Sequence, residues 1–119
     1  MIPLLLSIAL GYGLGNIQTA YFLGRWARKI DIRKHGTTNA GASNAAVTLG
    51  LGYGLVPFII DGAKGFLALF LVRHWFPEQP TLPLLAGIFA ILGHIYPLFL
   101  GFRGGKGMAA LFGVLLAAD

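Results

Sequence analysis

Three long apolar runs constrain the fold of this chain more than any other feature, and they occupy residues 2–23, 51–75 and 82–100. Each run is long enough to cross a bilayer as a helix, which takes about 20 residues. Only 11% of the 119 residues are charged, whereas soluble domains carry roughly 25% charged residues. We therefore predict an all-α fold, a polytopic membrane helical bundle with about three full spans.

A fourth apolar segment, residues 108–118, is rich in alanine and leucine and is predicted to be helical. It has about half the length that a span requires. We therefore expect a partial fourth helix within a single integral-membrane domain over residues 1–119. We also expect this domain to be the N-terminal part of a larger multi-span fold.

Basic residues gather in particular connections between the apolar segments. Segment 24–49 carries five basic residues and one acidic residue, segment 101–106 carries two basic residues, and segment 73–81 carries one residue of each sign. With three spans, the two positive connections fall on one side of the membrane, and the positive-inside rule assigns that side to the cytoplasm. This placement is typical of membrane topology rather than of a nucleic-acid-binding face, so we expect no nucleic-acid partner.

Residues 31–49 form the one long polar stretch of the chain. Glycines let the backbone approach a ligand, and successive N–H groups can enclose an anion. Hydroxyl and amide side chains add hydrogen-bonding groups with little bulk. The same composition also suits a solvated loop rich in turn formers, so both interpretations stand at this point. The small polar residues are Gly36, Thr37, Thr38, Asn39, Gly41, Ser43 and Asn44.

Charged and polar residues also interrupt the second and third runs. Asp61 and Lys64 lie three residues apart in D-G-A-K-G, so on a helix they share one face and can pair. A charge at mid-membrane costs at least about 2.5–3.5 kcal/mol on insertion scales, which indicates either a structural ion pair or a polar site. His94 precedes Pro97 in G-H-I-Y-P, and a proline frees a carbonyl one turn earlier. This helix is therefore predicted to open near its end, with His94 either structural or part of a site.

The turn G-F-R-G-G-K-G, residues 101–107, precedes the last predicted helix. A glycine-rich turn with a lysine at a helix N-terminus favours phosphate binding. It is not a Walker A loop, because Leu100 stands where that motif has its first glycine and Gly107 where it has Ser or Thr. The chain has no cysteine, which excludes disulfides and thiol nucleophiles. We expect neither a cofactor nor a bound metal.

Three motifs together carry a resemblance to a known family. They read D-I-R-K-H-G-T-T-N-A-G-A-S-N, then D-G-A-K-G, then G-H-I-Y-P-L-F-L-G-F-R-G-G-K-G. In order, spacing and membrane setting they resemble the bacterial acyl-phosphate:glycerol-3-phosphate acyltransferase family (PlsY-type). The resemblance extends from about Gly15 to the last residue.

The resemblance implies a multi-pass enzyme of the bacterial plasma (inner) membrane with its active-site loops facing the cytoplasm. Such an enzyme moves a fatty acyl group from acyl-phosphate to the 1-position of glycerol 3-phosphate and gives lysophosphatidate for phospholipid synthesis. The implied partners are these two substrates, membrane lipid and the enzyme that makes acyl-phosphate.

The resemblance also implies roles position by position. Thr37, Asn39, His94 and Lys106 are implied in catalysis, and Thr37 stands where the family usually has a serine. Asp61 is implied as a structural or site ion pair. The residues implied in substrate or phosphate binding are Gly41, Ser43, Asn44, Lys64, Arg103, Gly104, Gly105 and Gly107.

Two positions depart from the family pattern. Thr38 replaces a glycine, which puts a β-branched side chain where φ freedom is expected. Val47 replaces an arginine, and the loss of its planar guanidinium is expected to weaken phosphate binding.

The implied chemistry needs no serine nucleophile. Ser43 lies in G-A-S-N-A rather than in the G-x-S-x-G of a nucleophile elbow. We expect direct acyl transfer without a covalent enzyme intermediate, and the phosphate of the substrate is our candidate for the proton acceptor.

Two other functions remain open on the sequence. The chain could be a non-catalytic fragment or degenerate paralogue that binds phosphate compounds or partners without turnover, which Val47 favours. It could also be a small anion channel or transporter that uses Asp61, Lys64 and His94 along a pathway. No inverted repeat favours the transporter.

Overall fold

The computed structural model describes all 119 residues, and it contains helices and turns but no strand. This confirms the predicted all-α fold. By length and apolar character, three segments can cross a membrane, namely Ile2–Arg28, Leu51–Trp75 and Leu82–Leu100. The elements in chain order are α1 (Ile2–Gly15), α2 (Thr19–Arg28), η1 (Ile32–Lys34), α3 (Ala42–Leu49), α4 (Leu51–Trp75), α5 (Leu82–Ile95), η2 (Leu98–Leu100) and α6 (Met108–Ala118).

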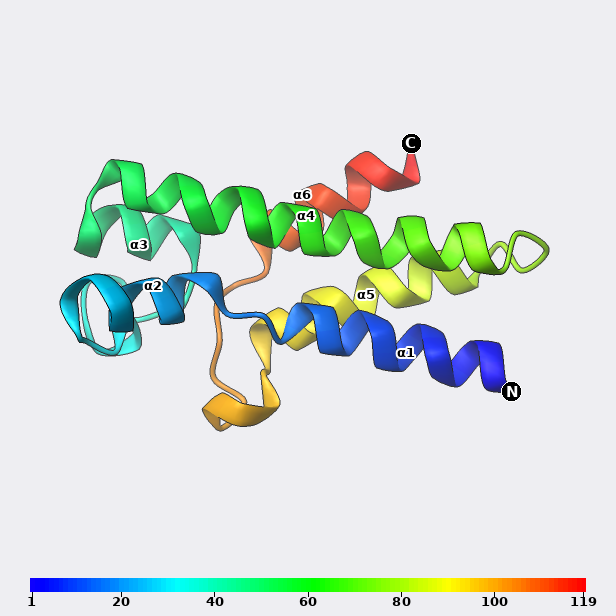
Figure 1. The fold of residues 1–119 in the computed structure, drawn as a ribbon, viewed down its shortest axis with the longest axis horizontal. Helices are drawn as coiled ribbons and strands as arrows, with labels where there is room; N and C mark the ends of the chain where they lie inside the picture. Colours follow the sequence, from blue (N-terminus) through cyan, green and yellow to red (C-terminus); the bar gives the residue numbers. More distant parts are fainter.

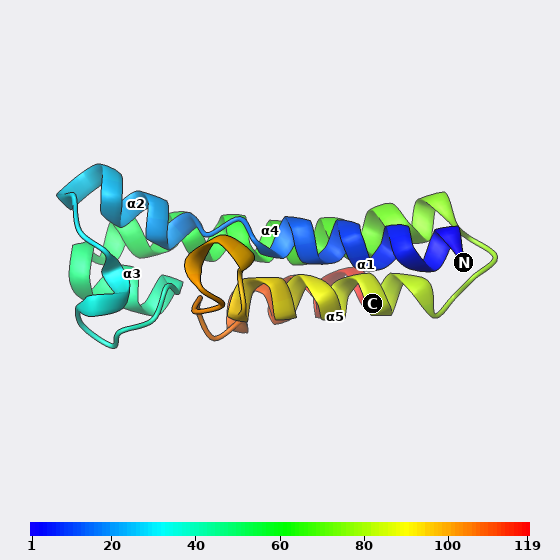
Figure 2. The same ribbon diagram turned by 90° about the horizontal axis from the view of Figure 1, so that it is seen from below.

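Four helices form an elongated bundle. Figure 1 shows α1, α4, α5 and α6 running along the longest axis, and Figure 2 shows the same bundle from below. The most extensive helix contacts are α1 with α5 and α4 with α6. The short helices α2 and α3 pack beside the first half of α4, at the opposite end from the N-terminus and the α4–α5 connection. The polar stretch is therefore folded at one end of the bundle.

Close backbone contacts between the helices depend on glycine. A Cβ atom on Gly11 of α1 would overlap the carbonyl oxygen of Ala86 in α5. A Cβ atom on Gly65 of α4 would overlap the carbonyl oxygen of Ala110 in α6 in the same way. Because the hydrophobic effect does not drive helices together within lipid, small residues that allow such approach stabilise the contact.

The first apolar run differs from the expectation of one continuous segment over residues 2–23. The helix ends at Gly15 and a second one begins at Thr19, so the run is broken at residues 16–18. At the break, Gln18 Nε2 donates to the carbonyl oxygen of Gly15 at 3.4 Å. Asn16 Nδ2 adds a hydrogen bond of 2.7 Å to the carbonyl oxygen of Tyr12, which also accepts from the N–H of Asn16. Carbonyl groups that a break frees within a membrane need such partners.

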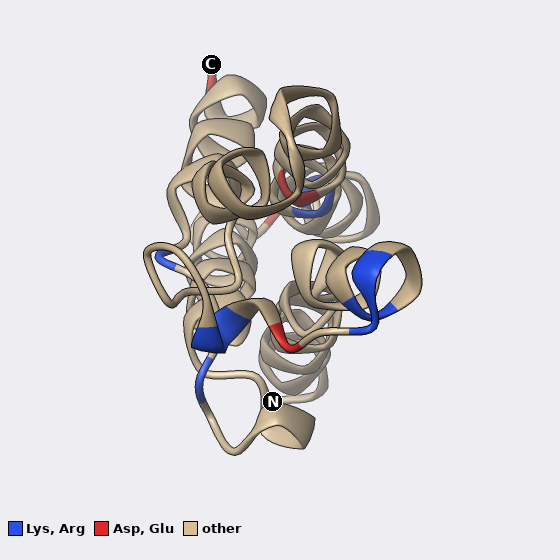
Figure 3. Cartoon of the chain, turned by 90° about the vertical axis from the view of Figure 1, so that its left-hand side faces the viewer, with Lys and Arg blue, Asp and Glu red and all other residues tan.

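The two basic connections of the chain are in contact with each other. The Nη1 atom of Arg33 donates to the carbonyl oxygens of Leu100 and Arg103 at 2.8 and 3.1 Å. The N–H of Ala40 donates to the carbonyl oxygen of Gly104 at 3.4 Å. Figure 3 looks onto the end formed by α2 and α3 and shows several of the Lys and Arg positions gathered there. The fold therefore joins the polar stretch to the G-G-K-G turn.

Candidate active site

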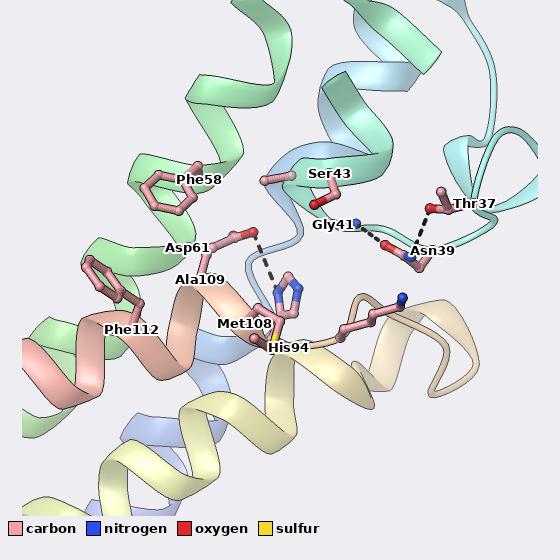
Figure 4. Close-up of a pocket in the computed structure, with 13 residues that line it drawn as sticks. Thr37, Asn39, Gly41, Ser43, Phe58, Asp61, His94, Met108, Ala109 and Phe112 are labelled. Atoms are coloured by element: carbon pink, nitrogen blue, oxygen red, sulfur yellow. Dashed lines mark hydrogen bonds and ion pairs between the residues drawn. The ribbon is translucent and has the colours of Figure 1, made fainter. Parts of the chain in front are cut away.

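A cavity of about 340 Å³ lies where the polar stretch, the middle of α4, the end of α5 and the start of α6 meet. Figure 4 shows polar side chains of the loop on one side of this cavity and the rings of α4 and α6 on the other. Its walls are formed by Thr37, Asn39, Gly41, Ala42, Ser43, Phe58, Asp61, His94, Lys106, Gly107, Met108, Ala109 and Phe112.

Asn44 is the residue around which the polar loop folds. Its side chain is fully buried. Its Oδ1 atom accepts hydrogen bonds from the N–H of Thr37 at 2.8 Å and from the hydroxyl of Thr48 at 3.0 Å. Its Nδ2 atom donates to the carbonyl oxygens of Ile32, His35 and Asn39 at 2.8, 3.1 and 2.7 Å. Asn44 therefore shapes the loop from behind and does not form a wall of the cavity.

Asn39 holds the part of the loop that faces the cavity. Its Nδ2 atom donates to the hydroxyl of Thr37 at 3.0 Å, and its Oδ1 atom accepts from the N–H of Gly41 at 3.0 Å. Thr38, between them, has φ of +67°. This is the left-handed region in which a β-branched residue is strained, so the glycine expected by the family pattern has a physical basis here.

Asp61, Lys64 and His94 form a buried cluster beneath the cavity. The ion pair that the spacing predicted is present, with Lys64 Nζ 3.1 Å from Asp61 Oδ1. The same Nζ lies 2.8 Å from His94 Nδ1 and donates to the carbonyl oxygens of Gly15 and Ile17 at 3.0 and 2.5 Å. The Lys64 ammonium therefore also stabilises the break after α1.

Only two members of this cluster reach the cavity. Asp61 and His94 line it, whereas Lys64 does not. Figure 4 shows the Asp61 carboxylate beside the imidazole ring of His94, and Oδ2 lies 3.9 Å from Nδ1. The cluster thus pairs buried charges and also presents two polar side chains to the cavity.

The glycines of the G-G-K-G turn place it across the end of α5. The N–H groups of Gly104 and Gly105 donate to the carbonyl oxygens of Ile95 and His94 at 2.9 and 3.2 Å. A Cβ atom on Gly104 would overlap the His94 carbonyl oxygen, and one on Gly105 would overlap His94 Nε2. These two glycines therefore serve close packing, while Lys106 comes to line the cavity.

The cavity brings together eight of the predicted site residues and leaves five outside. Those that line it are Thr37, Asn39, Gly41, Ser43, Asp61, His94, Lys106 and Gly107, and those outside it are Asn44, Lys64, Arg103, Gly104 and Gly105. The side chain of Arg103 is exposed.

Arg33 is a residue of this region that the sequence did not single out. Its guanidinium makes a two-point contact with the carboxylate of Asp31, at 3.0 Å from Nε to Oδ1 and 2.8 Å from Nη2 to Oδ2. These hydrogen bonds lower the pKa of Asp31 from 3.8 to about 2. The pair anchors the carbonyl groups of η2 and the turn, so it braces the site without entering it.

The sequence also provided no indication of the apolar side of the cavity. Phe58 and Phe112 line it and also line a neighbouring groove of about 450 Å³ between α4 and α6. They pack with ring centroids 6.2 Å apart. Within a membrane span nearly every side chain is apolar, so the sequence offers no signal that distinguishes a groove wall from a lipid-facing surface.

These features define a class of protein. The chain is an integral membrane helical protein with a polar, lysine-lined cavity that continues into an apolar groove. The family model described as glycerol-3-phosphate acyltransferase matches residues 5–119, and the chain belongs to this family, as the sequence motifs indicated.

Individual relatives agree with the family match. The chain is 42% identical to a glycerol-3-phosphate acyltransferase of Alkaliphilus metalliredigens over 119 residues, which are 100% of this chain and 60% of the relative. It is 44% identical to the one of Parasynechococcus marenigrum over 112 residues, which are 94% of this chain and 52% of the relative. The chain thus spans little more than half the length of these relatives.

Solved structures show the same fold. One is a crystal structure of PlsY (YgiH), an integral membrane glycerol 3-phosphate acyltransferase, in its glycerol 3-phosphate form. It matches with a TM-score of 0.90 at 34% identity, over 98% of this chain and 57% of that one. The lysophosphatidic acid form of the same protein matches with a TM-score of 0.86 at 33% identity, with the same coverage.

Proposed function

We propose that this chain takes part in the transfer of a fatty acyl group from acyl-phosphate to the 1-hydroxyl of glycerol 3-phosphate, which gives lysophosphatidate and inorganic phosphate. The observation that carries the proposal is the junction of the polar cavity with the apolar groove through Phe58 and Phe112. A donor with an anionic head and a long acyl chain needs both surfaces side by side. The relatives are named for the glycerol 3-phosphate acceptor.

The polar wall would bind the phosphate groups. Lys106 supplies a positive charge at the cavity, and Gly41 and Gly107 let the backbone come close to an anion. Thr37 and Ser43 add hydroxyl groups, and Asn39 fixes the Thr37 hydroxyl by its hydrogen bond. Donors fixed in position before the reaction stabilise developing negative charge most effectively.

The reaction would proceed in one displacement. The hydroxyl oxygen of the acceptor attacks the acyl carbonyl carbon, the bond from that carbon to the phosphate oxygen breaks, and the phosphate leaves with the electron pair. The hydroxyl proton passes to the departing phosphate, so no protein side chain has to accept it. A mixed anhydride already has a good leaving group, so neutralising the phosphate charge with Lys106 is the main task of the protein.

The same proposal includes the orientation of the bundle in the membrane and the source of the acyl-phosphate. The basic end of the bundle would face the cytoplasm of a bacterium, by the positive-inside rule. The acyl-phosphate would come from an enzyme that forms it and would reach the groove through the membrane.

Turnover in membranes that contain only this chain tests the proposal. Radiolabelled glycerol 3-phosphate is supplied with acyl-phosphate or with acyl-coenzyme A, and Lys106→Ala is run beside the parent chain. We expect lysophosphatidate from acyl-phosphate alone and at least about a 100-fold loss in Lys106→Ala. Lys34→Ala, which removes an exposed charge from the same end of the bundle, is the matched control.

The second candidate is binding without turnover, which Val47 favours. Val47 is 67% exposed on α3 and leaves the site without a guanidinium at that position. Binding of glycerol 3-phosphate by the parent chain, weakened in Lys106→Ala, with no product from either donor, would establish this alternative in place of catalysis.

A further inference from the structure

The two ring nitrogens of His94 lie in different surroundings. Nδ1 is 2.8 Å from Lys64 Nζ. Nε2 makes no hydrogen bond within the protein, although the side chain lines the cavity and is only 3% exposed. Figure 4 shows this second nitrogen on the side of the ring away from Asp61.

The chemistry of Lys64 decides which ring nitrogen carries the proton. An ammonium group donates hydrogen bonds and accepts none. The other contacts of Nζ are carbonyl oxygens of Gly15 and Ile17 and the carboxylate of Asp61, and all of them are acceptors. Nδ1 must therefore also accept, and a neutral imidazole whose Nδ1 accepts carries its proton on Nε2.

Asp61 does not compete for the same nitrogen. Its Oδ2 atom lies 3.9 Å from Nδ1, which is longer than a hydrogen bond. The backbone of His94 is also fixed, because its carbonyl oxygen accepts from Gln18 Nε2 at 3.1 Å and from the N–H of Gly105 at 3.2 Å. The ring is thus held with Nδ1 toward Lys64 and Nε2 toward Gly105 of the turn, at the cavity that His94 lines.

We propose that Lys64 is a positioning residue that holds His94 in the Nε2–H form, so that His94 donates a hydrogen bond to a phosphate oxygen of the bound substrate. His94 then stabilises the charge of the phosphate and does not take the proton of the acceptor hydroxyl. The hydrogen bond from His94 to the substrate rests on the proposed function, whereas the protonation of the imidazole ring does not.

NMR of protein that contains ¹⁵N-labelled histidine, in lipid nanodiscs, tests the protonation of the His94 ring directly. The ¹⁵N signals of His94 are those absent from His94→Gln, which separates them from the signals of His35 and His74. We expect a protonated Nε2 and an unprotonated Nδ1. A proton on Nδ1, or on both nitrogens, would overturn the proposal.

Removing Lys64 tests its role. The double variant Lys64→Met with Asp61→Leu leaves neither charge unpaired, and it should give a mixture of the two neutral forms of His94. An unchanged, pure Nε2–H form would show that Lys64 does not set it. Lys64→Gln keeps a donor at this place and should keep the Nε2–H form as a control. If the double variant does not fold, Lys64→Met alone decides the point, because it removes the donor opposite Nδ1 and should give the same mixture.

Ligand titration tests the donor role and identifies the phosphate. Inorganic phosphate, glycerol 3-phosphate and a non-hydrolysable acyl phosphonate are added in turn, and the Nε2–H signal is followed. A shift with the phosphonate and with inorganic phosphate would show that His94 binds the phosphoryl group of the acyl-phosphate. A shift with glycerol 3-phosphate alone would show that it binds the phosphate of the acyl acceptor. No shift with any of the three would overturn the donor role.

Two matched variants separate donation from packing. Glutamine places an N–H group near the position of Nε2, whereas asparagine keeps an acceptor near Nδ1 and presents nothing to the cavity. We expect His94→Gln to keep kcat within about tenfold of the parent and His94→Asn to lose about 100-fold. Equal losses would contradict donation. A parent chain without turnover would refute the proposed catalysis, and the nitrogen signals would still decide the form of His94.

Discussion

The side-chain oxygen of Asn44 accepts a hydrogen bond from the backbone N–H of Thr37 at 2.8 Å, across seven positions of the chain. One buried amide in the first turns of α3 thereby fixes the part of the loop that carries the Thr37 hydroxyl. Because the same side chain also binds three backbone carbonyl groups, the loop has its shape before any ligand arrives. Such preorganisation lowers the cost of binding.

Replacing Asn44 should therefore destabilise the protein as well as the site. Asn44→Ala leaves three carbonyl groups and one N–H group without this partner, and we expect a loss of at least about 2 kcal/mol in the free energy of unfolding. Thermal unfolding in detergent measures it. Thr48→Val removes only one of these hydrogen bonds and should cost about 1 kcal/mol. Equal stability of the parent and Asn44→Ala would contradict the role of Asn44.

Two glycines of α1 provide a matched test of helix packing. A Cβ atom on Gly11 would overlap the backbone of Ala86, whereas one on Gly13 would meet nothing within 4 Å. We expect Gly11→Ala to destabilise the bundle by about 1–3 kcal/mol through overpacking. Gly13→Ala should be neutral or stabilising by about 0.5–1 kcal/mol, because alanine favours the helix. Unfolding temperatures in one detergent compare them, and a similar change in both variants would argue against the α1–α5 contact.

Restoring an arginine at Val47 should strengthen phosphate binding. Ser43 lines the cavity, and Val47 follows it by one helical turn on the same face of α3. Long side chains of a helix point back toward its N-terminus, so an arginine here would reach toward the cavity. We expect Val47→Arg to lower KM for glycerol 3-phosphate about tenfold.

Val47→Lys is the control for that substitution. It adds the same charge without the planar fork and should give a smaller gain. An equal effect of the two variants would attribute the gain to charge alone, and no effect of Val47→Arg would place α3 too far from the phosphate.

Ser43 should contribute a hydrogen bond rather than a nucleophile. Direct transfer predicts that Ser43→Ala loses less than about tenfold in kcat/KM, the equivalent of one hydrogen bond. Steady-state turnover with acyl-phosphate measures this loss. Complete loss of activity in this variant, together with an acyl-serine trapped on the parent chain, would instead establish a covalent intermediate.

Filling the groove between α4 and α6 should reveal whether it holds the acyl chain. Ala63 is exposed and lines this groove, so Ala63→Trp should raise KM for a long-chain acyl-phosphate at least about tenfold, since each buried methylene contributes about 0.8 kcal/mol. KM for acetyl phosphate should not change. Leu55→Trp, on an exposed part of α4 outside the groove, is the control. The same increase in both variants would remove the groove from the proposal.

The sequence predicted the helices better than the site. The apolar runs gave the second span with its observed bounds, because a long apolar segment in lipid has to be a helix. The break at residues 16–18 was missed, since a run interrupted by Asn16 and Gln18 still has the composition of one span. The break is held by Lys64, which is 49 residues away from Gly15 in the chain. A contact between residues so distant has no local signal.

The site shows the same division between pattern and packing. The motifs indicated correctly which segments meet at the cavity, and eight of the predicted residues line it. They did not separate Lys106, which lines the cavity, from Arg103, which does not, although both residues are exposed. Both are basic residues of one turn, and only the path of the backbone across the end of α5 distinguishes them.

By itself, therefore, the sequence determined an all-α membrane fold, the family and the segments that carry its polar groups, because these follow from composition, hydropathy and motif spacing. Tertiary structure alone decided that Asn44 supports the loop from behind, that Lys64 binds His94 and the carbonyl groups at the break after α1, and that an apolar groove adjoins the cavity. The physical reason is that hydropathy acts along the chain, whereas hydrogen bonds and packing depend on distances between residues that only the folded chain brings together.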